Sequence, residues 1–118
     1  MLGCQRGPAL CKVQGQVKLD GKPLPQATVM FSPIGGGYTS LAETDADGHY
    51  ELKYSQGGVG AQLGKHRVTI ETYAIRAGSD GNPIEVPERL PARYHRDSTE
   101  EKELTEPAQT IDFDLQSK

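Results

Sequence analysis

The sequence of 118 residues has no tryptophan, and it holds only two cysteines and two phenylalanines. It also has no apolar run of about 18 residues, the length of a membrane-spanning helix, so we expect no such helix. Neither sign of charge is in large excess, because 13 Lys and Arg stand against 16 Asp and Glu, for a formal net charge of -3. Such a chain creates no field that would attract a polyanion, and we expect no nucleic-acid partner.

Glycine and proline, in contrast, are common, with 14 and 8 residues. Both disfavour helix interiors and are typical of short strands joined by turns, and the chain length fits one domain. Apolar side chains at alternate positions predict strands in the segments 13–19, 27–33, 50–52, 65–73 and 110–115. The pairs Asp20–Gly21 and Asp47–Gly48 predict two tight hairpin turns between such strands.

Two weaker strand segments, near Tyr94 and Leu104, bring the expected number to about seven. That number predicts an all-β fold, a seven-stranded Greek-key β-sandwich. Residues 74–91 contain three prolines and predict a long surface excursion. The segment 98–104, STEEKEL, leaves two interpretations open: a single helical turn capped by Ser98, with Glu101 completing a capping box, or a solvated acidic turn.

Cys4 follows Leu2 and Gly3, and this order resembles the end of a bacterial lipobox, in which apolar and small residues precede an acylated cysteine. We therefore expect Cys4 to be a lipid attachment site, residues 1–11 to form a tether, and residues 12–118 to form one β-sandwich domain. The charged and apolar parts of a signal peptide are not in the sequence, so we expect it to begin just before the processing site. A Cys4–Cys11 disulfide and an unmodified Cys4 remain open alternatives.

The order of several segments resembles a known family across nearly the whole chain. These segments are VQGQVKLDGKPLPQATVMFSP, AETDADGHYEL, GAQLGKHRVTIET, PARYH and IDFDL. Together they resemble the small lipoproteins of planctomycete-type bacteria, which are similar to carboxypeptidase regulatory-like and transthyretin-like domains. The resemblance implies a seven-stranded prealbumin-like sandwich, export to the bacterial envelope, either periplasm or cell surface, and often a lipid anchor. It implies no assigned biochemical activity.

Acidic residues and histidines are the candidates for metal or acid–base chemistry. Glu43, Asp45 and Asp47 alternate like the start of a calcium loop, but loop position twelve is Tyr54, where an EF-hand needs an acidic ligand. We therefore regard all three as weak metal candidates within an ordinary turn, and we expect no cofactor. The histidines, which lie far apart in the sequence, are expected to be surface side chains: His49, His66 and His95.

The sequence favours a domain without catalytic activity. It has no G-x-S-x-G nucleophile motif, and its end, Leu115 to Lys118, departs from the Tyr-Arg-Gly-Ser end of the transthyretin-like purine-pathway hydrolases. We therefore expect it not to be an enzyme. The alternative hypothesis is a small hydrolase or metal-dependent enzyme that uses His and Asp side chains at one end of the sandwich.

A basic and aromatic tract gives the candidate interaction surface: Arg93, Tyr94, His95 and Arg96. We expect Tyr94 to pack against the domain and the charges to be solvated, and such a tract can also contact an acidic glycan or a partner loop. The favoured hypothesis is a non-catalytic accessory module that binds an envelope protein or carbohydrate through its loops. Its contact with the membrane would be through the lipid anchor alone, and the sequence does not determine its oligomeric state.

Overall fold

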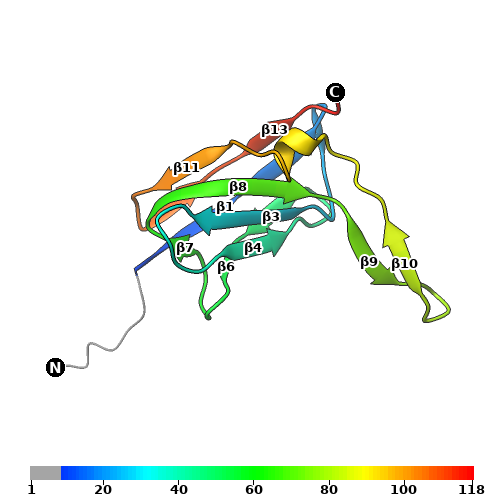
Figure 1. Ribbon diagram of the computed structural model, residues 1–118, viewed down its shortest axis with the longest axis horizontal. Coiled ribbons are helices and arrows are strands. Elements are labelled where there is room, and N and C mark those ends of the chain that lie inside the picture. The colour runs from blue at the N-terminus through cyan, green and yellow to red at the C-terminus, as the bar shows by residue number, and fades with distance from the viewer. Residues whose placement is uncertain (1–8) are drawn as a thin grey trace.

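The computed structural model describes residues 9–118, which form short strands and one 3₁₀ turn, η1 (Ala92–Tyr94) (Figure 1). Two sheets enclose a common core, and a two-stranded arm extends from them. This arrangement confirms the predicted all-β sandwich, with its strands divided into thirteen segments among the described residues. No helix in this part of the chain is long and apolar enough to cross a membrane. Cys4 lies outside the described residues.

The first sheet is organised around one long strand, β1 (Leu10–Leu19). Three short strands pair with it antiparallel: β7 (Ala61–Gln62), β5 (His49–Glu51) and β2 (Lys22–Pro23). Two strands from the end of the chain pair with it in parallel: β12 (Ala108–Thr110) and β13 (Phe113–Leu115). The strand includes Leu10 and Cys11, the last two residues of the predicted tether, because Cys11 pairs with Ala61 and is fully buried.

The second sheet has the strand order β11-β8-β3-β4-β6. The bounds are β3 (Thr28–Pro33), β4 (Ser40–Glu43), β6 (Lys53–Tyr54), β8 (Gly64–Glu71) and β11 (Glu101–Leu104). The central pair is antiparallel, with Val29 opposite Ile70 and Phe31 opposite Val68. Since side chains alternate along a strand, these four residues face the first sheet together, and all are buried.

The core confirms most of the predicted inward positions. Val13, Val17, Phe113 and Leu115 from the first sheet join the second sheet's apolar residues in one buried cluster, and Ile111 packs against it half-buried. Gly15 also faces inward, and a Cβ atom there would lie 1.9 Å from the Ile111 carbonyl oxygen. Only glycine therefore allows β1 to approach the junction between β12 and β13 so closely.

Both predicted hairpin turns use glycine as expected. Asp20 and Gly21 both have positive φ, at 53° and 84°, as a type I′ turn requires. Gly48 has φ 79°, and a Cβ atom there would lie 2.5 Å from the Val17 carbonyl oxygen. The second turn is therefore packed directly against β1, which fixes the position of the acidic side chains beside it.

The predicted excursion is an ordered hairpin arm, β9 (Ala74–Ala77) and β10 (Pro83–Val86), which projects from the sandwich (Figure 1). Glu88 closes its base, because its carboxylate accepts hydrogen bonds from the N–H groups of Thr72, Tyr73 and Leu90 and from the Thr72 hydroxyl. Burial alone would raise the pKa of Glu88, but these bonds outweigh it and lower the pKa.

The segment 98–104 forms neither a helical turn nor a solvated acidic turn, the two interpretations that its sequence left open. Glu101 to Leu104 form the edge strand β11, paired with β8, in agreement with the strand expected near Leu104. Ser98 caps no helix: it is buried, and its hydroxyl donates to the Val68 carbonyl and accepts from the Glu100 N–H. The long-range pairing with β8 overrides the local helix preference of this acidic segment.

Candidate functional site

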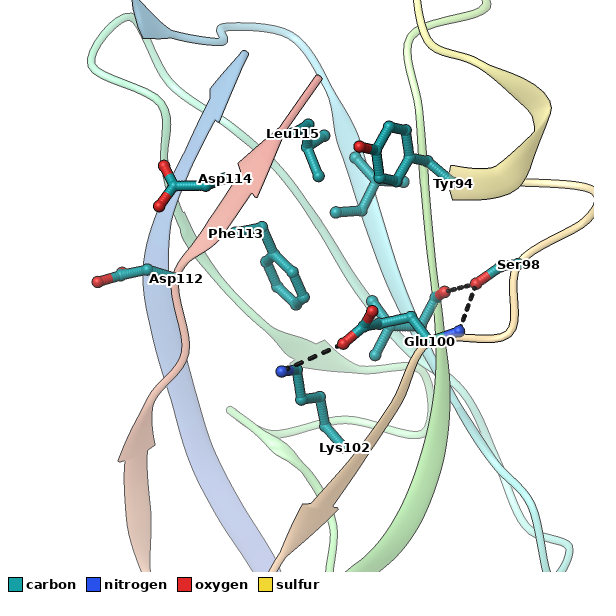
Figure 2. A pocket seen from close by; sticks show the side chains of 10 residues that line it. Tyr94, Ser98, Glu100, Lys102, Asp112, Phe113, Asp114 and Leu115 are labelled. Carbon is teal, nitrogen blue, oxygen red and sulfur yellow. Dashed lines mark hydrogen bonds and ion pairs between the residues drawn. The ribbon is translucent and has the colours of Figure 1, made fainter. Parts of the chain in front are cut away.

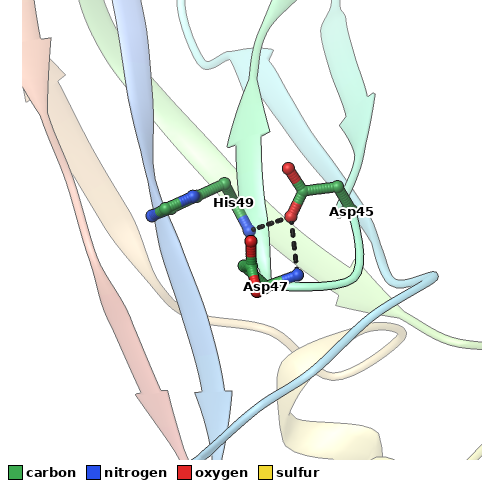
Figure 3. Close-up of side chains that lie close together, drawn as sticks. All are labelled: Asp45, Asp47 and His49. Carbon is green, nitrogen blue, oxygen red and sulfur yellow. Dashed lines mark hydrogen bonds between the residues drawn. The ribbon is translucent and has the colours of Figure 1, made fainter.

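The turn between β4 and β5 gathers three potential metal ligands, Asp45, Asp47 and His49, each exposed (Figure 3). One ligand atom from each lies within 4.8 Å of the others. The turn itself accounts for their closeness. Asp45 Oδ1 accepts hydrogen bonds from the N–H groups of Asp47 at 2.9 Å and His49 at 3.0 Å, so this carboxylate already satisfies the backbone of the turn.

Glu43 and Tyr54, the other two positions compared with a calcium loop, are not members of this cluster. Glu43 forms an ion pair with Arg76 of the arm and is not one of the clustered ligands. Tyr54, at the twelfth loop position, is buried and donates its hydroxyl proton to Gln62 Oε1 at 2.9 Å. Three exposed ligands are fewer than the six to eight oxygens that Ca²⁺ takes. The geometry is therefore that of an acidic hairpin turn with His49 beside it.

The three histidines do not form one site. His49 is exposed beside the aspartates, whereas His95 is half-buried, with Nε2 3.1 Å from the Leu90 carbonyl oxygen. His66 corrects the expectation of a surface side chain, because it is fully buried in β8, with Nε2 2.6 Å from the Gln62 carbonyl oxygen. Its inward direction follows from strand alternation, since it precedes the buried Val68 by two positions. Neither His66 nor His95 belongs to the aspartate cluster.

The basic and aromatic tract lies on η1, beside the end of the chain. Tyr94 packs against the core as expected, and its hydroxyl accepts a hydrogen bond from the Gln116 N–H at 2.9 Å. The Arg93 guanidinium lies over the Tyr94 ring, 4.7 Å from its centroid, and donates to the Lys118 carbonyl at 2.6 Å. Arg96 is exposed. The contacts of Tyr94 and Arg93 thus hold this segment in place, and it presents positive charge to the solvent.

The same end of the sandwich is held by a second polar contact. Asp20 in the first hairpin turn accepts hydrogen bonds from the hydroxyl and the N–H of Ser117. These bonds lower the pKa of the Asp20 carboxyl, because they favour its charged form. The β1–β2 turn, η1 and the C-terminal residues are therefore joined in one network, which gives the tract a fixed position.

Sequence reasoning did not identify a cleft between the edges of the two sheets (Figure 2). It has a volume of about 200 Å³, and its apolar lining includes Tyr94, Phe113 and Leu115. Lys102 lies at its mouth, 3.2 Å from Glu100 and 5.7 Å from the centre of the Phe113 ring. The volume is below the range usual for small-molecule sites. The sequence carries no local signal for this cleft, because its lining comes from segments that are distant along the chain.

No protein-family model and no curated protein matches this chain. Among solved structures, the chain is similar to BcpA, the major pilin subunit of Bacillus cereus, with a TM-score of 0.54 and 12% sequence identity. The likeness covers 92% of this chain and 30% of the pilin. A 9R-lipoxygenase from Cyanothece PCC8801 gives a TM-score of 0.49 at 14% identity, covering 98% of this chain and 18% of that one. What this chain shares with the pilin is the β-sandwich fold, which is compatible with a transthyretin-like domain.

Proposed function

We propose that this chain is a non-catalytic interaction module of the bacterial envelope, anchored through a lipid on Cys4. The module binds an acidic group of a protein or carbohydrate with the tract around η1. The proposal rests on the resemblance of residues 2–4 to a lipobox and on one geometric observation: Leu10, at the start of β1, and η1 lie at opposite ends of this strand.

The ends of β1 are well separated. Leu10, six residues after Cys4, pairs with Gln62 at one end of the strand, and Leu19 pairs with Leu115 at the other. A strand rises about 3.3 Å per residue, so these ends lie about 30 Å apart. Tyr94 bonds to Gln116, the residue after Leu115. An anchor at Cys4 would therefore leave the η1 end accessible to a partner.

The chemistry of the η1 end favours an acidic partner. Arg93 and Arg96 are both exposed, and Arg93 stacks on an aromatic ring, an arrangement that orders its guanidinium at little entropic cost. Guanidinium groups bind carboxylates, sulfates and phosphates through paired hydrogen bonds. Because the net charge of the whole chain is -3, this attraction is local to the tract and does not extend to polyanions in general.

Lipidation is tested on the protein from its source cells, by intact mass and by partition into a detergent phase. The expected result is a diacylglyceryl group on Cys4 and partition into detergent, both lost in Cys4→Ala. An unmodified chain that stays in the aqueous phase would contradict the anchor.

The binding surface is tested separately, with arrays of sulfated and carboxylated glycans and with acidic peptides. Arg96→Ala removes one exposed charge from the tract, and Lys65→Ala removes one exposed charge from β8 as the matched control. We expect Arg96→Ala to weaken binding about tenfold, the effect of one lost charge-assisted hydrogen bond, and Lys65→Ala to leave it unchanged. Equal loss in both variants would show non-specific attraction and reject the assignment to η1.

A further inference from the structure

The hairpin arm has one edge that can accept another strand. In its antiparallel pairing, Arg76 lies opposite Ile84, and the Gly78 N–H donates to the Asn82 carbonyl at 2.7 Å. Hydrogen-bonded and non-bonded pairs alternate along such a ladder. The backbone groups of Ala74 and Arg76 therefore point toward β10, and those of Ile75 and Ala77 point away from it, along the outer edge of β9.

The outer edge of β10 is blocked by proline. The positions whose backbone groups point outward there are Pro83, Glu85 and Pro87, and two of these three have no N–H to donate. On β9 both outward positions, Ile75 and Ala77, have an N–H group. β9 pairs with no other described strand than β10. The arm thus presents one open edge and one closed edge.

The side chains along the open edge are apolar on one face. Tyr73 and Ile75 are 43% and 65% exposed and lie on the same side of the ribbon. The Tyr73 hydroxyl donates to Glu85 Oε2 at 2.8 Å, which holds the ring over that face. Arg76 points to the opposite face, where it forms its ion pair with Glu43 of β4. This contact connects the arm to the sandwich.

We propose that β9 pairs antiparallel with β9 of a second copy of this chain, with Ile75 opposite Ile75 on a two-fold axis. In this register each Tyr73 lies opposite Ala77 of the other copy, so a large side chain meets a small one. Arg76 lies opposite Ala74, so no like charges face each other and the ion pair to Glu43 is kept. Each Ile75 exchanges two backbone hydrogen bonds with the other, and each Ala77 N–H donates to a Tyr73 carbonyl.

The self-complementary register favours a second copy over an unrelated extended peptide. Pairing with its own copy brings Tyr73 opposite Ala77 and Arg76 opposite Ala74, whereas an unrelated peptide gives these matches only if its sequence supplies small side chains at both positions. Because the β10 edge is closed, two copies use up the open edges and the pairing ends at a dimer. A four-stranded ribbon results, in which Tyr73, Ile75 and Ala77 of both copies lie on one face at its centre.

Site-specific crosslinking tests the register. Ile75→Cys is made in a Cys4→Ser background, where the remaining thiol, Cys11, is fully buried, and it is treated with a short bis-maleimide. Opposed residues of a bonded pair lie about 5.5 Å apart at Cα, within reach of the reagent. The matched control is Ile84→Cys, also exposed and on the same arm. In the dimer its two copies are three strand spacings, about 14 Å, apart. We expect a covalent dimer from Ile75→Cys alone, and equal crosslinking of both variants would overturn the register.

Sedimentation equilibrium tests the association without added thiols. We expect the Cys4→Ser protein to form a reversible dimer, and Ile75→Lys, which opposes two like charges, to raise its dissociation constant at least tenfold. Ile84→Lys adds the same charge to the other face and should leave the constant unchanged. Circular dichroism establishes that both variants fold. A protein that stays monomeric at concentrations on the order of 1 mM, or one whose β9 edge is protected only by an added extended peptide, would overturn the proposal.

Discussion

The hydroxyl of Tyr50 in β5 donates a hydrogen bond of 2.6 Å to the carbonyl oxygen of Ile111, between β12 and β13. Tyr50 is buried, and burial raises the pKa of its hydroxyl, so the proton is retained for this bond at any ordinary pH. The carbonyl also faces Gly15 of β1. One bond therefore connects the second hairpin to the end of the chain across the first sheet.

Replacement of Tyr50 by Phe removes the hydroxyl, so the Ile111 carbonyl loses this hydrogen bond. We expect Tyr50→Phe to lower the free energy of unfolding by about 1 kcal/mol, the usual net value of such a bond, as measured by urea denaturation. Tyr38→Phe is the control, because Tyr38 is 55% exposed. Equal losses in the two variants would show that the bond to Ile111 has no special contribution.

Gly15→Ala places a methyl group where the Ile111 carbonyl oxygen now lies. Since the Cβ would be 1.9 Å from this oxygen, β1 must separate from the β12–β13 junction, and we expect a loss of more than about 2 kcal/mol in unfolding free energy. Gly35→Ala is the control, because its Cβ meets no atom within 4 Å. Thermal melts of both proteins provide the comparison. A Gly15→Ala protein as stable as the control would refute the close approach.

Glu88 makes stability depend on pH. Its pKa is lower in the folded protein than in the unfolded chain, so its contribution to stability is present above the unfolded pKa and is lost as pH falls through the folded pKa. We expect Glu88→Gln to reduce the slope of unfolding free energy against pH in this acidic window, and Thr72→Val, which lacks the donating hydroxyl, to reduce it less. Urea titrations from about pH 6 to pH 3 measure the slope. An unchanged slope in Glu88→Gln would contradict this role.

Asp45 supports its turn with or without a metal ion. Asp45→Ala deprives two N–H groups of their acceptor, and we expect a loss of about 1 kcal/mol, larger than that of Asp47→Ala. The loss should be the same in excess EDTA and in millimolar CaCl₂, because the bonds involved are internal. A wild-type protein that calcium stabilises, with that gain absent from Asp45→Ala, would instead establish a metal site at this turn.

Cys11 should be an inert thiol in the folded protein. Burial, and after it the charge of Glu106, raises the pKa of the thiol, and both effects disfavour the reactive thiolate. In a Cys4→Ser background, we expect a disulfide reagent at pH 8 to label Cys11 at least about 100-fold more slowly in native buffer than in urea, since labelling requires opening of β1. Labelling at equal rates would place the start of β1 outside the fold.

The features predicted correctly from the sequence are those that depend on residues close together along the chain. Alternation placed Val29 and Phe31 inward, and the Asp20–Gly21 pair indicated its turn, because both properties are local to a few residues. The closeness of Asp45 and His49 also arises from one tight turn, although only Glu43, Asp45 and Asp47 were named as metal candidates from the sequence. The same alternation, extended back from Val68, places His66 in the core. The expectation of a surface histidine was wrong because it followed the polarity of the residue type and not the alternation of the strand.

Other features depend on partners that are distant along the chain. The strand β11 pairs with β8, and the signal for a strand near Leu104 is weak, because the acidic residues of STEEKEL equally favour a helical turn. The arm's contact through Glu43 and Arg76 joins residues 33 positions apart, and the cleft beside Phe113 lies between the edges of two sheets. Single-sequence patterns do not report such pairings, because local propensity is overridden by tertiary contacts.

The parallel pairing of β1 with β13 brings the first and last described strands side by side. A chain leaves the ribosome with its N-terminus first. The end of β1 therefore emerges about 90 residues before β13. Until Phe113 and Leu115 arrive, one side of the core has no cover, and strand pairing over such a separation is intrinsically slow. The core therefore closes only after residues 113–115 have emerged, and we expect a chain that stops before Phe113 to unfold at a lower urea concentration than the full sequence.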